Sequence, residues 1–460
     1  MTDRTAESVG APQSRQTLLC LALVVTGLGN LVMPATVDQF LPINYIALTS
    51  FILALAIMVH LRRVAEHVVR TPSLVVFVAL TIPGMVAAPL NQYGTTKTVA
   101  IALALIMILA ASAFRDPRRS TLMIIALIYV LGLLTAAALM LFGQYNIYGR
   151  LSLFELNPIG IGRVCALVPI ISVGWLLLGR TRSLLRSGLH VAALLLALSA
   201  AVATGSRGPL VAAIAGVGVI ALVAMRHRGS RVWAIILVGG IVVSVSYVVE
   251  HLPRFPGLQR LELASDSGRV DLIQQSLAAF MTHPMGVGWG NLGQYVVGFS
   301  RPDRYTFYPH NILIEMAVEG GVLAISGFLL LLITAFIRVL RSTARAIDRR
   351  LADCEDGPED LIAPALVLAL LTASVVNAQF SSDIVGNRLL WVMIGLALVS
   401  PAFGQGHSFE EKEFRGGFRA HRRRAPQRPS AAIRPHPGRA RAPLRRARPR
   451  GPQRGHPDDT

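Results

Sequence analysis

Residues 121–143 have the sequence TLMIIALIYVLGLLTAAALMLFG and contain no Asp, Glu, Lys or Arg. A bilayer core about 30 Å thick is crossed by a helix of roughly 20 apolar residues. A run this long and this apolar therefore predicts a transmembrane helix. Arg118 and Arg119 precede it, and basic residues beside a span favour the cytoplasmic side of the membrane.

Eleven further runs of similar length and low charge are present in the chain. With the first, they lie at about 17–33, 41–60, 73–90, 96–114, 121–143, 158–179, 188–204, 209–225, 232–249, 314–337, 361–379 and 389–404. The composition agrees, because 53% of the residues are hydrophobic and only 15% are charged. The sequence predicts an all-α, polytopic integral membrane protein with about twelve transmembrane helices.

Basic residues fall on alternate connections between these runs. Several arginines lie in each of the segments 62–70, 115–119, 180–186, 226–231 and 338–350, whereas the other short connections hold at most Lys97, Arg150, Arg207 or Arg388. The first set is expected to be cytoplasmic, and both termini with it. Since the net charge of +19 is spread over these loops and the tail, we expect no binding of nucleic acid.

The expected organisation has five parts. These are a cytoplasmic N-terminus at 1–16, nine helices within 17–249, a periplasmic loop at 250–313, three helices within 314–404, and a cytoplasmic tail at 405–460. The loop is too long for a turn and cannot lie in hydrocarbon, so it is expected on or above the outer surface. The Arg- and Pro-rich tail is expected to be disordered. A solvated tail is favoured over one that binds anionic lipid.

The outer loop contains a predicted amphipathic helix that begins near Ser265 and ends at His283-Pro284. Arg269 falls in its first turn, where the guanidinium and the free backbone N–H groups favour a bound anion. An ion pair between Arg269 and Asp266 or Asp271 is the alternative, and it is slightly favoured. The glycines in Gly286-Val287-Gly288-Trp289-Gly290, which follow this helix, are interpreted as packing residues.

A polar group marks the beginning of the tenth span. In Tyr308-Pro309-His310-Asn311, Pro309 suits the first helical position, which places His310 just inside the helix and favours its neutral, basic form. Asn311, Glu315 and Glu319 follow at a spacing of four and form one stripe. Ionisable groups at membrane depth are costly, so both carboxylates are expected to face protein or water.

Two more arginines lie near the expected outer surface. Arg207, in a turn too short to leave the membrane surface, suits bidentate binding of phosphate, although contact with lipid headgroups is the alternative. Arg163 lies inside the sixth span and is either structural or functional. With no DxD, His cluster or P-loop motif, the pattern predicts recognition of a lipid-linked phosphate or diphosphate without metal or other cofactor.

Together these residues resemble the O-antigen ligase and polymerase superfamily of bacterial envelope glycosyltransferases. The resemblance extends from about the fourth span to the last and rests on the order and spacing of several pieces. They are the Ser206-Arg207-Gly208 turn, the arginine-bearing helix of the large loop, His283-Pro284-x-Gly286-x-Gly288, Pro309-His310-Asn311 and Glu319-Gly320-Gly321.

The resemblance implies a metal-independent, inverting enzyme of the bacterial inner membrane. It would move a glycan from an undecaprenyl-diphosphate carrier to an acceptor hydroxyl at the periplasmic face. In the family, the residue matched by His310 would activate that hydroxyl, and those matched by Arg207 and Arg269 would bind the diphosphate. Apart from the resemblance, Arg163 is a further candidate for diphosphate binding because of its depth in the sixth span, and the polar stripe of Asn311, Glu315 and Glu319 is expected to support the site. Ligases of the family have a Gly-x-x-Gly/Thr/Tyr pattern where this chain has Gly321 and Ala324, so ligase and polymerase both stay open and polymerase is favoured.

Two other classes of protein are alternatives. A transporter of small anions or lipid-linked glycans would suit twelve spans, but transporters usually have charged broken helices and repeated halves, and the sequence predicts neither. A non-catalytic scaffold of a polysaccharide assembly complex would need neither His310 nor Arg207.

Overall fold

The computed structural model describes residues 11–32, 44–146, 149–154, 156–179, 183–226, 232, 235, 240, 267–297, 307–351, 359–381 and 383–404. Almost all of the expected span at 232–249 and the whole tail from 405 onward lie outside these residues.

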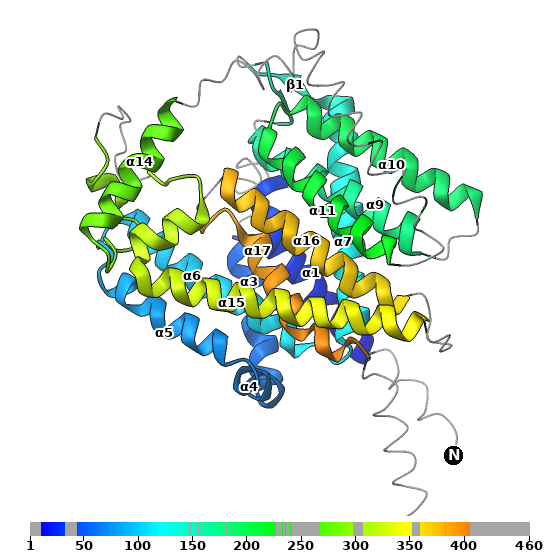
Figure 1. The fold of residues 1–460 in the computed structure, drawn as a ribbon, viewed down its shortest axis with the longest axis horizontal. Coiled ribbons are helices and arrows are strands. Elements are labelled where there is room, and N and C mark those ends of the chain that lie inside the picture. The colour runs from blue at the N-terminus through cyan, green and yellow to red at the C-terminus, as the bar shows by residue number, and fades with distance from the viewer. Residues whose placement is uncertain are drawn as a thin grey trace, which may run out of the picture. The chain divides into compact units, whose positions relative to one another are not determined.

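Helices form nearly all of the regular structure in the described part of the chain (Figure 1). Up to the large loop they are α1 (Ala11–Val32), α3 (Tyr45–Val59), α4 (Leu61–Val69), α5 (Pro72–Val86), α6 (Gln92–Ala110), η1 (Ala111–Ala113), α7 (Pro117–Phe142), α8 (Pro158–Cys165), α9 (Leu167–Leu178), α10 (Leu184–Ala203) and α11 (Arg207–Met225). Two short antiparallel strands, β1 (Gln144–Tyr145) and β2 (Leu151–Ser152), lie between α7 and α8, and Gln144 pairs with Ser152.

The second part of the chain contains α14 (Ser267–Thr282) and η4 (Leu292–Gln294) within the expected outer loop. The helices α15 (Ile312–Leu351), α16 (Glu359–Phe380), α17 (Arg388–Val399) and η6 (Ser400–Gly404) follow. The sequence accounts for several of the helix starts. Asn44, Asn91, Asp116 and Asn157 each accept a backbone N–H at the beginning of α3, α6, α7 and α8, as N-cap residues do.

Helices lie over every expected span except 232–249, which is outside the described residues. Within the described part, seven helices are long and apolar enough to cross a membrane, and the pair α3 and α4, bent by 83°, would make an eighth. Shorter apolar helices lie at Ser14–Gly29, Pro72–Val86 and Arg388–Phe403. The chain is thus an all-α, multi-pass membrane protein, and the number of twelve spans stays a prediction.

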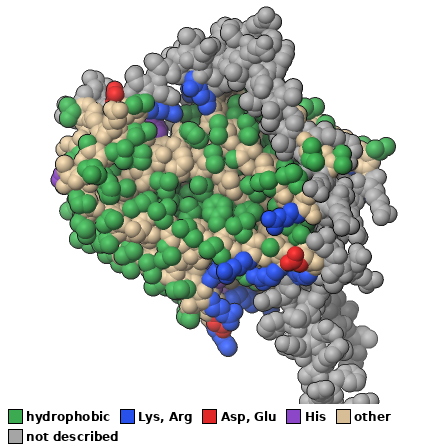
Figure 2. Space-filling view, in the orientation of Figure 1, with side chains coloured by type: hydrophobic (Ala, Val, Ile, Leu, Met, Phe, Trp, Pro, Cys, Tyr) green, Lys and Arg blue, Asp and Glu red, His purple; other side chains and the backbone are tan. Residues whose placement is uncertain are grey.

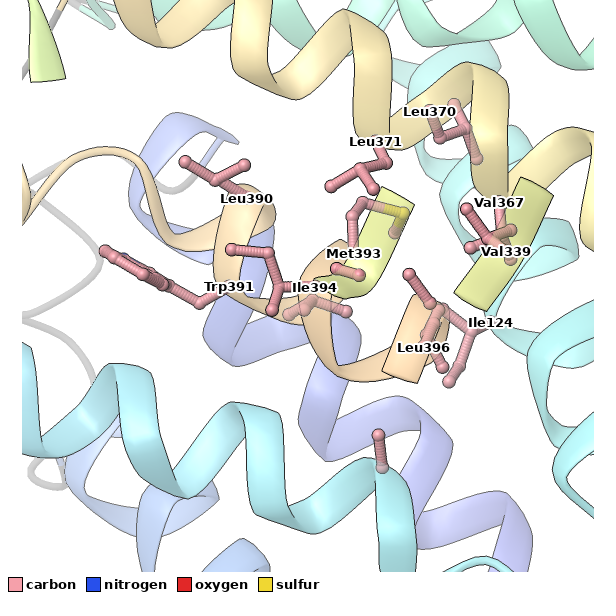
Figure 3. Packing of buried hydrophobic residues seen from close by; sticks show 14 of the residues in the cluster. Ile124, Val339, Val367, Leu370, Leu371, Leu390, Trp391, Met393, Ile394 and Leu396 are labelled. Atoms are coloured by element: carbon pink, nitrogen blue, oxygen red, sulfur yellow. The ribbon is translucent and has the colours of Figure 1, made fainter. Parts of the chain in front are cut away.

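The core is built around α17, whose residues from Leu390 to Val399 are all buried. Figure 3 shows its side chains packed among those of α16, with Val339 of α15 and Ile124 of α7 close by. Trp391 also contacts the rings of Phe77 in α5 and Phe328 in α15 at centroid distances of 6.0 and 5.6 Å.

Loops expected on the cytoplasmic side lie close together. The Arg63 guanidinium donates to the Ala113 carbonyl at 3.3 Å, and Arg338 donates to the carbonyls of Arg70 and Leu398. Figure 2 shows Lys and Arg side chains gathered at the edge near α4, beside a broad apolar face. This arrangement is typical of a membrane protein whose basic loops share one side, and the direction in which it inserts stays a prediction.

Candidate active site

Arg163 holds the C-terminal end of α16. It lies in α8, is only 6% exposed, and its Nη2 donates to the Ser381 carbonyl at 2.5 Å, the Asn387 Oδ1 at 2.9 Å and the Asn377 carbonyl at 3.3 Å. Its Nη1 donates to the Gly386 carbonyl at 3.4 Å. A cation at a helix C-terminus is favoured by the helix dipole. These contacts fit the structural interpretation of Arg163, and a contact between Arg163 and a diphosphate stays a prediction.

The turn with Arg207 lies against the same end of α16. Arg207 is the first residue of α11 and is exposed. A Cβ built on the next residue, Gly208, would lie 3.0 Å from the Phe380 Cβ, so a side chain at position 208 would crowd Phe380. The short turn therefore keeps Arg207 beside the final residues of α16.

Arg269 reaches this point from the large loop. It lies in the first turn of α14, as the sequence predicts, and its Nη1 donates to the Phe380 carbonyl at 3.4 Å. Asp266, one of the two alternative partners expected for Arg269, lies outside the described residues. Three segments that carry the predicted phosphate-binding arginines thus meet at the C-terminal end of α16, although their sequence positions span more than a hundred residues.

His310 lies just outside α15, which corrects the expectation that Pro309 begins this helix. Asn311 is the cap, because its Oδ1 accepts the N–H groups of Leu313 and Ile314 at 3.0 and 3.1 Å. Asn is among the strongest N-cap residues, and here it begins the helix at Ile312, three residues later than the proline signal does. His310 has a left-handed backbone with φ of 55°, and its ring lies 4.4 Å from that of Tyr308.

Glu315 and Glu319 are fully buried on α15, as expected for carboxylates that face protein. Their partner is Lys97, which corrects its expected position in an outer loop. Lys97 lies inside α6 and is 0% exposed, with its Nζ 2.7 Å from Glu315 Oε1 and 2.6 Å from Glu319 Oε2. The cap at Asn91 begins α6 early enough to take Lys97 into the helix.

Further polar groups extend this cluster toward the turn at 381–387. The Tyr93 hydroxyl donates to Asp383 Oδ2 at 3.0 Å, and the Tyr93 ring lies 4.8 Å from Lys97 Nζ. The backbone N–H of Ile384 donates to Glu315 Oε2 at 3.0 Å. The turn that supplies partners to Arg163 therefore also supplies partners to the carboxylates below His310.

α15 is broken at Gly321, where φ is 75° and ψ is −177°. The glycine-rich segment after α14 fills the break. The N–H groups of Val287 and Gly288 donate to the carbonyls of Val318 and Glu319, each at 2.9 Å, and the Val322 N–H donates to the Pro284 carbonyl at 2.8 Å. The segment is a packing element, as predicted. Because α15 is broken and carries two buried carboxylates, it corrects the expectation that the chain has no charged, broken helix.

Trp289 anchors this segment between two helices. It is 0% exposed, its backbone N–H donates to the Gly84 carbonyl at 3.1 Å, and its Nε1 donates to the Thr81 carbonyl at 3.3 Å. A Cβ on Gly84 or Gly320 would lie within 3 Å of the indole. The large loop is therefore inserted between α5 and α15 at this point.

Part of the chain is similar to a known protein family. Residues 192–329 match the family model described as O-antigen ligase. The matched range contains Arg207, Arg269, His310 and both buried carboxylates, while Lys97, Arg163 and the turn at 381–387 lie outside it. No curated protein matches the chain. The match at 192–329 confirms the resemblance to the O-antigen ligase and polymerase superfamily.

Proposed function

We propose that the protein is a glycosyltransferase of the bacterial inner membrane that moves a glycan from an undecaprenyl-diphosphate carrier onto an acceptor hydroxyl at the periplasmic face. The observation that carries this proposal is the meeting of the segments of Arg163, Arg207 and Arg269 at one end of α16. Guanidinium groups match phosphate oxygens in geometry and charge, and several of them together suit a diphosphate.

The reaction is a single displacement. The acceptor oxygen attacks the anomeric carbon while His310 takes the hydroxyl proton, and the bond between that carbon and the diphosphate oxygen breaks with its electron pair leaving on the diphosphate. One displacement inverts the configuration at the anomeric carbon. The arginines stabilise the negative charge that develops on the leaving group.

The geometry of His310 supports its role as the base. A residue other than glycine rarely adopts a left-handed backbone, and such conformations cluster at functional sites, where the surrounding structure holds them. Here the Asn311 cap and the neighbouring Tyr308 ring fix the residue at the beginning of α15. His310 is thus presented beside the helix end and outside its hydrogen-bonded turns.

The arginines have two different roles, which are direct contact with the diphosphate and electrostatic attraction over a longer distance. Arg207 is exposed and Arg269 is partly exposed, which supports a role for both in direct binding of phosphate oxygens. Arg163 is buried behind the end of α16, where its charge acts on the diphosphate over a longer range and its hydrogen bonds fix the turn at 381–387. Asn311, Glu315 and Glu319 support His310 from α15.

A reconstituted transfer assay tests the proposal. Purified protein in liposomes is given a lipid-linked oligosaccharide and an acceptor, and the covalent product is measured. His310→Ala and Arg207→Ala should each lower transfer by at least about 100-fold while insertion stays normal. Tyr129→Phe, which removes a hydroxyl from a half-buried residue of α7, is the matched control. Transfer retained by both alanine variants would refute the mechanism.

The products separate ligase from polymerase. If deletion of the gene in its host leaves single repeat units on the carrier and removes long polymer, the protein is a polymerase, which we favour. If full-length polymer stays on its carrier and no longer reaches an acceptor, it is a ligase. His310→Ala should fail to complement in either case, while normal polymer from strains with His310→Ala or Arg207→Ala would favour the scaffold.

A transporter is the second candidate, because α15 is broken at Gly321 and carries two buried carboxylates. Broken, charged helices are typical of secondary transporters, where they line the path of the substrate. In this protein the backbone of residues 284–290 fills the break, which favours a packed role. Movement of a lipid-linked glycan across liposomes without covalent transfer would favour the transporter.

A further inference from the structure

Lys97, Glu315 and Glu319 form a buried cluster, here named the Lys97 cluster, that the family resemblance does not assign. All three side chains are 0% exposed, and the Lys97 Nζ lies within 2.7 Å of both carboxylates. Lys97 lies on α6, whereas both glutamates lie on the short half of α15 that precedes the break at Gly321. The cluster therefore joins this half-helix to α6 by charge.

Glu319 connects the cluster to the large loop. Its Oε2 accepts the Gly290 N–H at 3.0 Å in addition to the Lys97 ammonium, and its backbone carbonyl accepts the Gly288 N–H at 2.9 Å. One residue thus binds the loop at two points. The position of the segment 284–290 in the break of α15 depends on where Glu319 is held.

Glu315 connects the cluster to the turn that carries the arginine contacts. Its Oε2 accepts the Ile384 N–H at 3.0 Å, and the same turn provides Arg163 with the Ser381 carbonyl and the Asn387 side chain. At its own end of the half-helix, the Glu315 N–H donates to the Asn311 carbonyl at 2.9 Å, one residue after His310. His310 and the turn at 381–387 are therefore both linked to the first half of α15, the half-helix that forms the ion pairs with Lys97.

Lys97 is the only basic side chain that forms an ion pair with these carboxylates within the described residues. Removing one member of a buried ionic group leaves the others as uncompensated charges, whereas replacing every member by neutral groups of similar shape is often tolerated. Loss of Lys97 alone should therefore drive the two glutamates, and the loops they bind, out of place. Loss of all three charges should be far milder, because glutamine keeps an oxygen for the Ile384 and Gly290 N–H groups.

We propose that Lys97 is a positioning residue for the transfer reaction: by its ion pairs to Glu315 and Glu319 it holds the first half of α15, and so sets the places of His310 and of the turn at 381–387 that contacts Arg163. Lys97 itself touches no reacting atom. The inference rests on the proposed glycosyltransferase function for its consequence, but the placement it describes is measurable without any activity.

Hydrogen exchange of the whole protein in liposomes tests the placement. Peptides covering 284–292, 309–316 and 383–388 are compared among wild type, Lys97→Met, the triple variant Lys97→Met, Glu315→Gln, Glu319→Gln, and the control Tyr129→Phe. Lys97→Met should speed exchange in all three peptides by at least about 10-fold and leave α11 unchanged. The triple variant should return to within about threefold of wild type, and Tyr129→Phe should match wild type.

Glycan transfer by the same four proteins tests the consequence. The rate of glycan transfer should be at least about 100-fold lower in Lys97→Met than in wild type, since small displacements of catalytic groups have effects of that size. The triple variant should be about 10-fold or more faster than Lys97→Met. A general loss of packing would give no such recovery. Lys97→Gln, which removes the charge but keeps hydrogen-bond donors, replaces Lys97→Met if that variant does not fold, and it should speed exchange in the same three peptides.

The outcomes separate the two proposals. Unchanged exchange in Lys97→Met, or a triple variant that performs no better than Lys97→Met, would overturn the positioning role. Wild-type protein that transfers no glycan would instead refute the proposed function, and the exchange comparison would still decide whether Lys97 places the loops.

Discussion

Lys97 and Arg163 are two buried cations that the protein compensates in different ways. Lys97 is held between two carboxylates, at 2.7 and 2.6 Å. Within the described residues, the hydrogen bonds of Arg163 go to three backbone carbonyls and one side-chain amide, all of which are neutral. The positive charge of Lys97 is therefore compensated by opposite charges in direct contact with it. The positive charge of Arg163 is stabilised only by neutral dipoles.

This difference separates a structural role, which is to hold helices and loops in place, from recognition of an anionic ligand. A charge cancelled by its neighbours exerts little field at a distance, and its value lies in the elements it joins. A charge solvated by neutral dipoles keeps its field, because dipoles lower its energy without removing its sign. Arg163 can therefore favour a nearby anion while its hydrogen bonds fix the end of α16, and Lys97 is suited to structure alone.

The largest expected effect is that of Lys97→Met on stability. The substitution leaves two fully buried carboxylates without their cation, which should lower the free energy of unfolding by about 4 kcal/mol. Thermal unfolding in detergent, followed by circular dichroism, measures the change. A loss below about 1 kcal/mol, which is typical of an exposed ion pair, would mean that the carboxylates are not compensated by Lys97.

Gly288→Ala should have the second largest effect on stability. It tests the loop segment 284–290, which contacts Glu319 of the Lys97 cluster. Gly288 has φ of 92°, and a Cβ there would meet the Ala87 carbonyl. The combined backbone strain and clash should lower the free energy of unfolding by about 3 kcal/mol.

Gly218→Ala in α11 is the matched control for this change. A Cβ at Gly218 meets nothing within 4 Å, so stability should stay the same or rise by about 0.5–1 kcal/mol. Equal losses in the two variants would show that the segment 284–290 does not need its close approach.

Arg163→Met should be milder for stability than Lys97→Met and more specific for donor binding. It leaves neutral carbonyls without a donor, which should cost about 2 kcal/mol by unfolding in detergent. If the field of Arg163 reaches the diphosphate, KM for the lipid-linked donor should rise in Arg163→Met and rise less in Arg163→Lys. Equal KM values in the two variants would reduce Arg163 to a structural residue.

Much of the fold follows from the sequence because membrane spans depend on length and apolarity. The run at 121–143 becomes α7, and the run at 158–179 becomes α8 and α9. The break in α15 was not predicted, because Gly320-Gly321 lies within a run, 314–337, whose length and apolarity predict one continuous helix. The break depends on hydrogen bonds from residues 284–290, which no local pattern in α15 contains.

The candidate site was predicted in part. The cost of ionisable groups at membrane depth indicated that Glu315 and Glu319 face protein or water, and in the structure both are buried within the protein. The sequence pattern did not identify Lys97 as their partner, because Lys97 and Glu319 are 222 residues apart in the chain, although the Lys97 Nζ lies 2.6 Å from Glu319 Oε2. A lone lysine at the edge of an apolar run is itself a signal, since an ionisable group inside a span is a functional candidate. The end of α16 gave no comparable signal, because it contributes backbone carbonyls.

Trp289→Phe should give the smallest effect and is the finest test of the loop. Phenylalanine keeps most of the ring packing against Gly84 and Gly320 but loses the hydrogen bond from the indole Nε1 to the Thr81 carbonyl. One buried hydrogen bond is worth about 1 kcal/mol, so unfolding in detergent should shift by that amount while exchange at 383–388, on the Arg163 side, stays at the wild-type rate. Faster exchange at 383–388 would mean that the Lys97 cluster and the turn beside Arg163 are coupled through the segment 284–290 as well as through Glu315. The structural role of Lys97 and the anion-binding role of Arg163 would then not be separate.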